Sequence, residues 1–356
     1  MKQIKFFMSL AIILSISACG STADFVQTSE PQISPSQTIP NEDVQTQQTT
    51  PPTADVQPEP QSLFLQIQTT LRSNPPCTGN NEVRQDAILT LDGYLKDDAS
   101  RWNPDVMTFY GNMMGFVESE IAEPVTSGVR IWSMYNHGFI VKTPSSVFAF
   151  DLVQGYPSWK YQIPNSVLGQ IQVLFLSHKH DDHWDRTIIR AITDLGGKVV
   201  APLEEKLSDQ DMVYLSADEE STQAGLQIKA YDGLHGGVPT RMYVVTTPEG
   251  LTILHTGDNQ TSETLPDGLN VDILLLNAWV NESGSASPVV GVRNSINKLN
   301  PRLTILGHIQ EMSHTYDPSD PRSRLSFEAP LAVDDGLLPG IMSVQIWGER
   351  CVFPPE

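Results

Sequence analysis

The stretch that decides the fold is Val173–Trp184, which reads VLFLSHKHDDHW. Its first four residues are apolar and typical of a buried strand. Four side chains that can bind a metal follow within six positions: His178, His180, Asp182 and His183. An open zinc site needs three such ligands plus water, so one loop with four of them is predicted to serve two ions. A single histidine is more often a core or surface residue, but here that explanation would have to hold at every position.

The order His-x-His-x-Asp-His after an apolar strand resembles the signature loop of the metallo-β-lactamase superfamily. Its continuation through Trp184, Thr187 and Ile188 looks most like one branch of that superfamily, which contains the ascorbate-phosphate lactonases and the phospholipases D that cleave N-acylphosphatidylethanolamines. The resemblance spans about residues 129–308. It implies an α/β fold, the αββα four-layer sandwich, with a metal site at one edge of two stacked sheets.

Three later segments place a metal-capable side chain within four residues of the end of an expected strand, as the signature loop does. His235 follows the strand expected at 226–231, inside a glycine-rich loop. Asp258 follows the second arm of an expected hairpin, and His308 follows the strand expected at 303–306. The resemblance implies that these strand ends complete a site for two divalent metal ions.

The resemblance also assigns each ligand to an ion. The first ion would be held by His178, His180 and His235. The second ion would be held by Asp182, His183 and His308. Asp258 would bridge both, because each of its two oxygens can bind a cation. His314 competes with His308 for the last position and is otherwise a candidate to contact substrate. Asp182 and Asp258 are the candidate catalytic carboxylates.

This ligand set predicts a hydrolase. Two cations about 3.5 to 4 Å apart can share a water, lower its pKa and stabilise the oxyanion formed on attack. The resulting metal-bridging hydroxide would cleave a small ester, lactone, amide or phosphodiester without a protein nucleophile. No Gly-x-Ser-x-Gly motif occurs in the sequence. Zn²⁺ is the expected metal, with Mn²⁺ or Fe²⁺ as alternatives, since the same ligands accept all three.

Two other interpretations stay open. The first is a true metallo-β-lactamase, although the ligand set lacks the cysteine found in many of those enzymes and includes a bridging role for Asp258 that they lack. The second, from a different class, is a catalytically inactive metal- or solute-binding lipoprotein. A glutamate in place of His180 would instead have indicated the oxygen-reducing di-iron branch of the superfamily.

The first 19 residues are typical of a bacterial lipoprotein signal peptide. Lysines at positions 2 and 5 precede an apolar run that is too short to span a membrane. The sequence Ile16–Cys19 resembles a lipobox, which would make Cys19 the lipidated first residue of the mature chain. An ordinary cleaved signal is the alternative. The predicted location is the bacterial cell envelope, lipid-anchored and facing the periplasm or the exterior.

Three regions are expected after the signal peptide at 1–19. Residues 20–61 are rich in Gln, Thr, Pro and Ser and are predicted to form a disordered tether. The metallo-β-lactamase-type domain is expected at 62–356, with a helical extension at about 62–125 and the core at about 129–356. Within the extension, Ile88, Leu91 and Leu95 recur at helical spacing and predict an amphipathic helix.

Cysteines and net charge limit the partners. With Cys19 lipidated, Cys77 and Cys351 are the one remaining pair, and export favours a disulfide between them over two free thiols. The formal net charge of −20 makes nucleic acid a poor partner, because phosphates need a basic surface. The expected partners are a small-molecule substrate and, through the lipid anchor, a membrane.

The remaining elements follow from apolar runs and turn residues. Strands are expected at 129–135, 139–143, 147–152, 198–201, 241–247, 251–254, 271–276 and 343–347. Helices are expected around Ile188, Ile192 and Leu195 and, after an N-cap at Ser287, around Val289, Val292, Ile296 and Leu299. His137 lies in the first turn, where it either faces the metal site or has a structural hydrogen-bonding role. His255 is expected beneath the site.

Overall fold

The computed structural model describes residues 60–79, 81–154, 162–207, 211–280, 288–312, 314–318, 325–333 and 337–354. The expected signal peptide, the lipidation site at Cys19 and nearly all of the expected tether therefore lie outside the described residues. Helix α1 (Pro60–Ser73) begins slightly before the expected boundary at residue 62. None of the helices in these ranges is long and apolar enough to cross a membrane.

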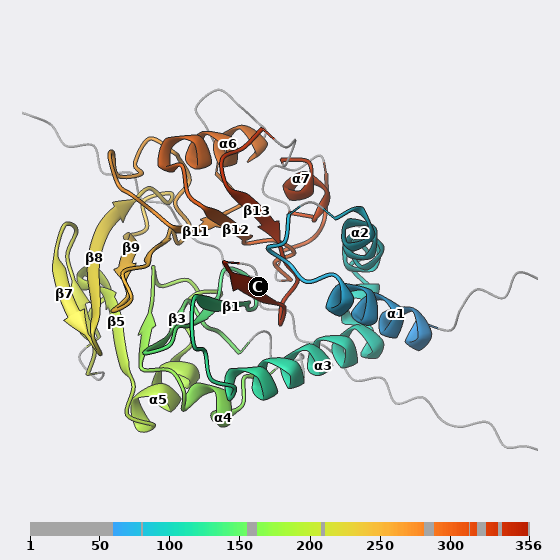
Figure 1. Cartoon of the computed structure of the whole chain (residues 1–356), viewed down its shortest axis with the longest axis horizontal. Helices are drawn as coiled ribbons and strands as arrows, with labels where there is room; N and C mark the ends of the chain where they lie inside the picture. The colour runs from blue at the N-terminus through green and yellow to red at the C-terminus, as the bar shows by residue number, and fades with distance from the viewer. Residues whose placement is uncertain are drawn as a thin grey trace, which may run out of the picture. The chain divides into compact units, whose positions relative to one another are not determined.

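Two seven-stranded mixed sheets form the centre of the domain (Figure 1). In spatial order, the first sheet contains β14 (Arg350–Phe353), β1 (Val129–Ser133), β2 (Phe139–Lys142), β3 (Val147–Phe150), β4 (Val173–Phe175), β5 (Lys198–Pro202) and β6 (Val213–Leu215). The second contains β13 (Ile341–Val344), β12 (Leu303–Gly307), β11 (Ile273–Asn277), β10 (Thr252–His255), β9 (Thr240–Thr246), β8 (Leu226–Gly233) and β7 (Glu220–Gln223).

Helices cover the outer faces of both sheets. The remaining helices are α2 (Glu82–Lys96), α3 (Pro104–Ile121), α4 (Asn165–Leu168), α5 (Arg186–Asp194), α6 (Pro288–Leu299) and α7 (Glu328–Leu331), with 3₁₀ turns η1 (Ser100–Trp102) and η2 (Leu203–Glu205). Helix α5 packs on β5 of the first sheet and α6 packs on β11 of the second, on opposite sides of the molecule (Figure 1). The predicted αββα sandwich with a helical N-terminal region is confirmed.

Each central strand contributes to two cores, because successive side chains point to opposite faces of a sheet. In β4, Val173 and Phe175 belong to a cluster that contains strand residues of both sheets, so it lies between them. Leu174 belongs to the cluster that also contains the helices. All three side chains are fully buried. Burial on both faces explains why this strand reads as a continuous apolar run rather than an alternating one.

Strand direction brings the candidate ligands to one edge. Strands β3, β4, β5 and β6 run parallel in the first sheet, and β10, β11, β12 and β13 run parallel in the second. The loops that leave the carboxyl ends of β4, β10 and β12 carry His178, Asp258 and His308, respectively. Ligands in open α/β sheets bind at this edge.

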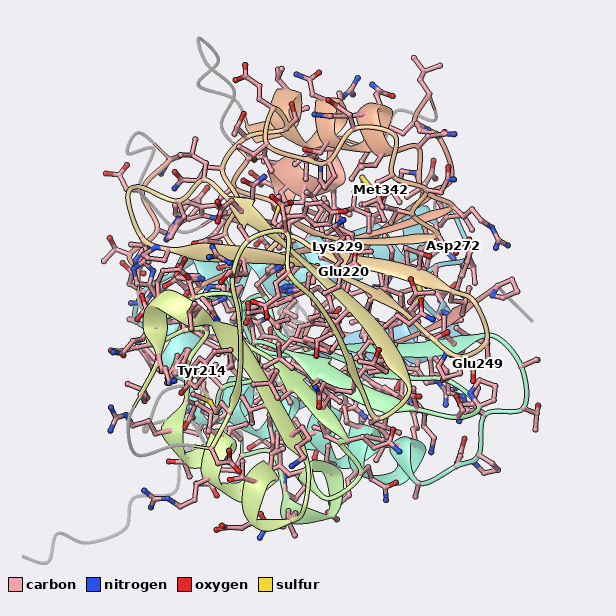
Figure 2. The ribbon with its side chains drawn as sticks, turned by 90° about the vertical axis from the view of Figure 1, so that its left-hand side faces the viewer. Tyr214, Glu220, Lys229, Glu249, Asp272 and Met342 are labelled. Atoms are coloured by element: carbon pink, nitrogen blue, oxygen red, sulfur yellow. A yellow bond between two sulfur atoms is a disulfide. The ribbon has the colours of Figure 1, made fainter. Side chains whose placement is uncertain are left out.

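The tip of the β9–β10 hairpin ties the two sheets together away from that edge. The Glu249 carboxylate accepts hydrogen bonds from the backbone N–H and the hydroxyl of Ser145, at 2.9 and 2.6 Å, in the turn between β2 and β3 (Figure 2). At the outer edge of the second sheet, Lys229 on β8 pairs with Glu220 on β7 at 3.2 Å. That exposed ion pair contributes little to stability.

Some element boundaries differ from the sequence predictions. Helix α5 starts at the Asp185 N-cap and ends at Asp194, so Leu195 lies beyond it and is 48% exposed. The strand expected at 343–347 is β13, shifted towards the N-terminus to begin at Ile341. The short edge strands β6, β7 and β14 and the helices α4 and α7 were not predicted, because each spans three or four residues, too few for a periodic pattern to be recognised. Helices α1 and α3 lie within the region expected to be helical, but their individual bounds were not predicted.

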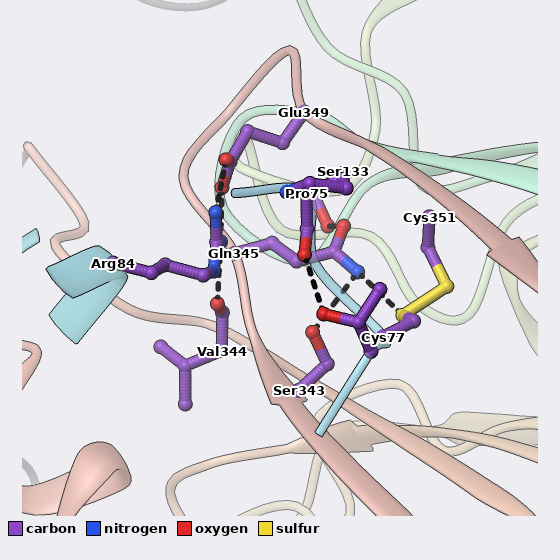
Figure 3. The surroundings of a disulfide bond; sticks show 10 residues. Pro75, Cys77, Arg84, Ser133, Ser343, Val344, Gln345, Glu349 and Cys351 are labelled. Atoms are coloured by element: carbon purple, nitrogen blue, oxygen red, sulfur yellow. Dashed lines mark hydrogen bonds and ion pairs between the residues drawn. A yellow bond between two sulfur atoms is a disulfide. The ribbon is translucent and has the colours of Figure 1, made fainter. Parts of the chain in front are cut away.

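The helical extension is fastened to the C-terminal end of the chain. Cys77 and Cys351 form a disulfide that joins the α1–α2 connection to edge strand β14 (Figure 3). Beside it, both terminal nitrogens of Arg84 donate to the carboxylate of Glu349 at 2.5 Å, and one of them also donates to the Val344 carbonyl at 3.0 Å. Both charged side chains are buried, so each depends on the other for neutralisation.

Replacing Cys77 and Cys351 together by serine is expected to lower the free energy of unfolding by about 2–5 kcal/mol. The bridge closes a loop with a sequence separation of 274 residues and so restricts the unfolded chain. Urea denaturation of the full chain checks this prediction, with both proteins kept under the same metal and redox conditions. An unchanged unfolding midpoint would contradict it, and a reductant added to the wild-type protein should reproduce the loss.

Candidate metal centre

The first group of candidate ligands contains His178, His180, His235 and Asp258, with one nitrogen or oxygen atom from each within 4.8 Å of the others. His180 Nδ1 lies 3.0 Å from His178 Nε2 and 3.2 Å from His235 Nε2. Asp258 Oδ2 lies 3.7 Å from His178 Nε2 and 3.8 Å from His235 Nε2. The structure therefore brings together three histidines from two separate loops and one carboxylate.

The second group contains Asp182, His183, His308 and Asp258, and its ligand atoms also lie within 4.8 Å of one another. His183 Nε2 is 3.1 Å from Asp182 Oδ2 and 3.2 Å from Asp258 Oδ1. His308 Nε2 is 3.2 Å from Asp258 Oδ2 and 3.6 Å from Asp182 Oδ2. Asp258 belongs to both groups, which is the arrangement that a bridging carboxylate requires.

Both groups fit a metal ion. His183 Nε2 and Asp258 Oδ1 are buried, and no hydrogen-bond partner for either lies in the described part of the chain. Bonds of about 2.0–2.1 Å to a tetrahedral zinc would place neighbouring ligand atoms roughly 3.3–3.4 Å apart. The measured separations of 3.0–3.8 Å bracket that value. A metal ion bound by both residues would contact His183 Nε2 and Asp258 Oδ1.

A sharp turn at Gly257 directs the Asp258 side chain towards the histidines of both ligand groups. Gly257 has φ of +50°, and an added Cβ would lie 2.6 Å from the Cβ of Ser177. Both the left-handed backbone and this close approach require glycine here. The turn follows β10, which pairs in parallel with β11, so the carboxylate leaves the sheet at the same edge as the other ligands.

Asp151, which sequence reasoning did not identify as a site residue, organises two of the histidines. Its carboxylate accepts hydrogen bonds from the Ser177 backbone N–H at 2.7 Å, the Ser177 hydroxyl at 2.6 Å and His183 Nδ1 at 2.8 Å. Because the single hydrogen of the Ser177 hydroxyl is thus occupied, its oxygen accepts from His178 Nδ1 at 2.9 Å. Both rings are thereby oriented with Nε2 towards the ligand groups.

The only sequence signal for this role was a carboxylate at the end of an apolar strand. In the structure Asp151 is fully buried and has φ of +44°, a conformation that few residues other than glycine, asparagine and aspartate adopt readily. Buried carboxylates that hold the far nitrogen of a metal-binding histidine raise the basicity of the ligand and fix its orientation.

Replacing Asp151 by asparagine is expected to weaken metal binding at both groups by about 10–100-fold. The amide cannot accept all three hydrogen bonds, so His183 and His178 lose their shared support. Titration of the metal-free chain with zinc checks this prediction. Asp218→Asn is the matched control, because Asp218 also has a positive φ, of 62°, but is exposed. Equal affinities in wild type and Asp151→Asn would contradict the role.

Asn136 is a second supporting residue that the sequence did not reveal. Its side-chain amide donates to Asp182 Oδ2 at 2.6 Å, and its backbone carbonyl accepts from the His308 N–H at 2.9 Å. Asn136 and His308 both have positive φ, at 57° and 62°. The turn after β1 thus holds two members of the second group through one residue.

Two of the three histidines outside the groups pack beneath them. His137 is fully buried and stacks on His255, with ring centroids 4.3 Å apart. His255 Nε2 donates to the His137 carbonyl at 3.0 Å, and His255 Nδ1 accepts from the Gly257 N–H at 3.2 Å. His255 therefore links the first turn of the domain to the turn that presents Asp258. His137 belongs to neither ligand group.

His314, the competitor of His308, lies outside both groups. It is exposed, and its ring centroid is 6.0 Å from that of Trp279. The Trp279 ring in turn lies 5.4 Å from the His308 ring. His314 Nε2 is 3.6 Å from the buried carboxylate of Glu311. Neither Trp279 nor Glu311 was identified from the sequence, because isolated residues after a strand carry no recognisable pattern.

The electrostatics of the side chains differ between the two groups. Burial lowers the pKa of His178 to about 3 and also lowers that of His235. Burial opposes charge on His308 too, but Asp258 and Asp182 outweigh it and raise its pKa to about 10. The same carboxylates, with Asp151, hold the pKa of His183 well above its usual value despite its burial.

Zinc binding to the second group is expected to weaken as pH falls from about 10 to 6, whereas binding to the first group changes little. A metal must displace the protons of His308 and His183, so affinity rises with pH below the raised pKa values. His178 is already neutral throughout this range. Calorimetry in buffers of different ionisation enthalpy measures the protons released. Equal proton release from both binding steps would contradict the difference between the groups.

Residues 136–306 match the sequence profile of the beta-lactamase superfamily domain. The chain is similar to the solved structure of CmlA, a diiron β-hydroxylase from Streptomyces venezuelae, at 15% identity and a TM-score of 0.46, over 65% of this chain and 55% of that chain. A metallo hydrolase from Ignicoccus hospitalis matches at 15% identity and a TM-score of 0.48, over 65% and 100%. An isothiocyanate hydrolase from Delia radicum gut bacteria matches at 16% and 0.45, over 63% and 98%.

No curated protein matches the chain significantly. The profile match nevertheless covers the signature loop, two of the later strand ends and most of both sheets. Together with the αββα layering, it supports a fold of the metallo-β-lactamase type, with residues 136–306 similar to the beta-lactamase superfamily domain.

Proposed function

We propose that the protein is a dinuclear metal-dependent hydrolase that acts on a small ester, lactone, amide or phosphodiester. The observation that carries this proposal is the shared Asp258 carboxylate, whose Oδ1 faces His183 and whose Oδ2 faces His178, His235 and His308. A pair of ligand groups with one common carboxylate suits two cations held close together.

The chain's own residues would hold the ions and their charge. His178, His180 and His235 would bind the first ion, Asp182, His183 and His308 the second, and Asp258 both. When bound, such ions lower the pKa of water and polarise a carbonyl or phosphoryl oxygen. Asp151 would keep His183 and His178 oriented throughout. The supporting hydrogen bonds need no rearrangement during turnover, which favours a preorganised site.

The cations would polarise the substrate group. Two divalent cations carry four positive charges, which Asp182, Asp258, the buried Asp151 and the attacking hydroxide would together balance. Held close to the scissile bond, the cations would stabilise the oxyanion that develops on attack at an ester, a lactone or a phosphodiester. Zinc is the proposed metal, because the ligand atoms are imidazole nitrogens and carboxylate oxygens.

Metal analysis combined with a reporter panel tests the proposal. The purified chain is expected to hold two zinc ions and to turn over at least one of p-nitrophenyl butyrate, a chromogenic lactone and bis(p-nitrophenyl) phosphate. Turnover confined to a chromogenic cephalosporin would instead indicate a β-lactamase. Full metal occupancy with no turnover of any reporter would favour a binding protein and contradict the proposed hydrolase.

We also propose that the protein is a lipoprotein of the bacterial cell envelope, anchored through Cys19 and facing the periplasm or the exterior. Its support is the signal-like pattern of residues 1–19 and the Cys77–Cys351 disulfide, since disulfides persist in oxidising compartments. Labelling of growing cells with an alkynyl fatty acid tests it. Labelled wild type and unlabelled Cys19→Ser are the expected results, and label on both would contradict the anchor.

A further inference from the structure

The chain that follows β12 forms one wall beside the second ligand group. We call residues 309–312 and 314–318 the rim segment. Within it, Glu311 is buried, with Oε2 3.9 Å from His308 Nδ1 and Oε1 3.6 Å from His314 Nε2. His314 is 46% exposed and stands next to Trp279, which itself contacts His308. This row of side chains leads from the second group to the surface.

The rim segment adopts a backbone that it would not hold by itself. Gln310 has φ of +58° while its side chain is fully buried, and the preceding His308 also has a positive φ. Such conformations are costly for residues other than glycine and persist where the surroundings determine them. Part of that surrounding is the core, since Gln310 N–H donates to the Leu325 carbonyl at 2.7 Å.

The N-terminal helical extension, which lies outside the profile match, also contacts the rim segment. The buried carboxylate of Asp92 in α2 accepts hydrogen bonds from the Gln310 side-chain amide and from the Phe327 N–H, the latter at 2.9 Å. Arg101 in η1, also buried, donates to the backbone carbonyl of His314. Asp98 accepts from the Tyr316 N–H at 3.4 Å.

These contacts connect positions more than 200 residues apart, at sequence separations of 213 to 235. Lys96 adds an ion pair with Asp92 at 3.0 Å and one with Glu328 in α7 at 2.5 Å. Helix α2 accordingly lies beside α7 (Figure 1). The C-terminal half of α2 and the turn η1 are thus joined to the rim segment and to α7.

We infer that the helical extension is a specificity-determining part of the active site, with Asp92 and Arg101 as the residues that position His314 and the rim segment against the substrate. This inference rests on the proposed hydrolase function. Substrate selection would then depend on contacts between the helical extension and the rim segment, which both lie outside residues 136–306. Metal binding would depend on the loops that follow the strands. Asp92 and Arg101 are positioning residues, because neither belongs to a ligand group.

Asp92→Ala and Arg101→Gln are expected to loosen the rim segment without loss of metal. Alanine removes Oδ1 of Asp92, which accepts from both Gln310 and Phe327 and which an asparagine amide oxygen would replace. The loss of a hydrogen bond to a charged group should speed amide exchange in the rim segment by about tenfold or more. Both variants should keep two zinc ions. Asp86→Ala, which removes an exposed carboxylate on the same helix, is the matched control and should leave exchange and activity unchanged.

Steady-state kinetics test whether the rim segment contacts the substrate. For the active reporters, both variants should raise KM several-fold, change kcat less and shift the ratio of kcat/KM between bis(p-nitrophenyl) phosphate and p-nitrophenyl butyrate. His314→Ala should reproduce the KM effect without the faster exchange of its neighbours. If one variant fails to fold, the other carries the test.

Three results would overturn the inference. The first is amide exchange that matches wild type in both variants. The second is faster exchange with unchanged KM and unchanged reporter preference. The third is loss of zinc from a folded variant, since these residues would then support the metals. If the wild-type chain turns over no reporter, the proposed hydrolase fails, and the dissociation constant of diphenyl phosphate replaces KM in the same comparison.

Discussion

Asp258→Ala is expected to lose both metal ions and to abolish hydrolysis. Asp258 is the one residue common to both ligand groups, and its two oxygens face different partners. Its removal should therefore cost more than the roughly 10–100-fold loss of metal affinity or activity that changes in supporting residues produce. It would also leave His183 and His308 without the carboxylate that contributes most to their raised pKa values.

Zinc content by mass spectrometry and reporter turnover, measured on the same preparation, check this result. Asp181→Asn is the matched control, because Asp181 is an exposed carboxylate in the same loop and belongs to neither group. It should keep both ions and full turnover. Retention of two zinc ions by Asp258→Ala would show that the carboxylate does not join the two groups.

His308→Ala is expected to lose the second ion, keep the first and lose nearly all turnover. His308 Nε2 lies close to Asp258 and Asp182, and His308 is a member of the second group only. A hydrolysis that needs both ions should fail when one is absent. Zinc content should fall from two ions to one per chain.

His314→Ala provides the comparison for that experiment. Because His314 lies outside both groups and is exposed, its loss should leave two zinc ions in place and affect mainly KM. The opposite pattern, in which His314→Ala removes an ion and His308→Ala does not, would reverse the assignment of the last ligand.

The ligand pattern could be predicted because the loop that contains His178 resembles the signature of the metallo-β-lactamase superfamily. Each later candidate, His235, Asp258 and His308, also lies within three residues of the end of an apolar strand, and the fold brings strand ends to one edge. The central strands were recognisable for the same physical reason, since burial on both faces demands continuous apolar residues.

The supporting residues could not be predicted in the same way. The role of Asp151 depends on a positive φ and on three donors that converge only after β3 and β4 pair. Asn136 reaches Asp182 across 46 positions of sequence. A hydrogen bond between residues far apart in the sequence has no local sequence pattern. From the sequence alone, an aspartate or asparagine at the end of a strand is therefore interpreted as a turn residue.

The extension was predicted as helical, but its contacts with the rim segment were not. Asp92 lies four residues after Ile88 and three before Leu95, on the apolar face of the expected helix, whereas Asp86 lies on the opposite face. This spacing is consistent with a buried Asp92, but it does not indicate which residues Asp92 contacts. Its burial follows from the disulfide and the Arg84–Glu349 pair, which fix the position of α2. Edge strands such as β14 were missed because pairing with β1 depends on where the chain returns.

The most direct test of the account is the crystal structure of the zinc-loaded protein, with anomalous scattering recorded at the zinc edge. The account predicts two zinc ions about 3.5–4 Å apart, the first bound by His178, His180 and His235, the second by Asp182, His183 and His308, and both by Asp258. A single ion, or two ions that do not share Asp258, would contradict it.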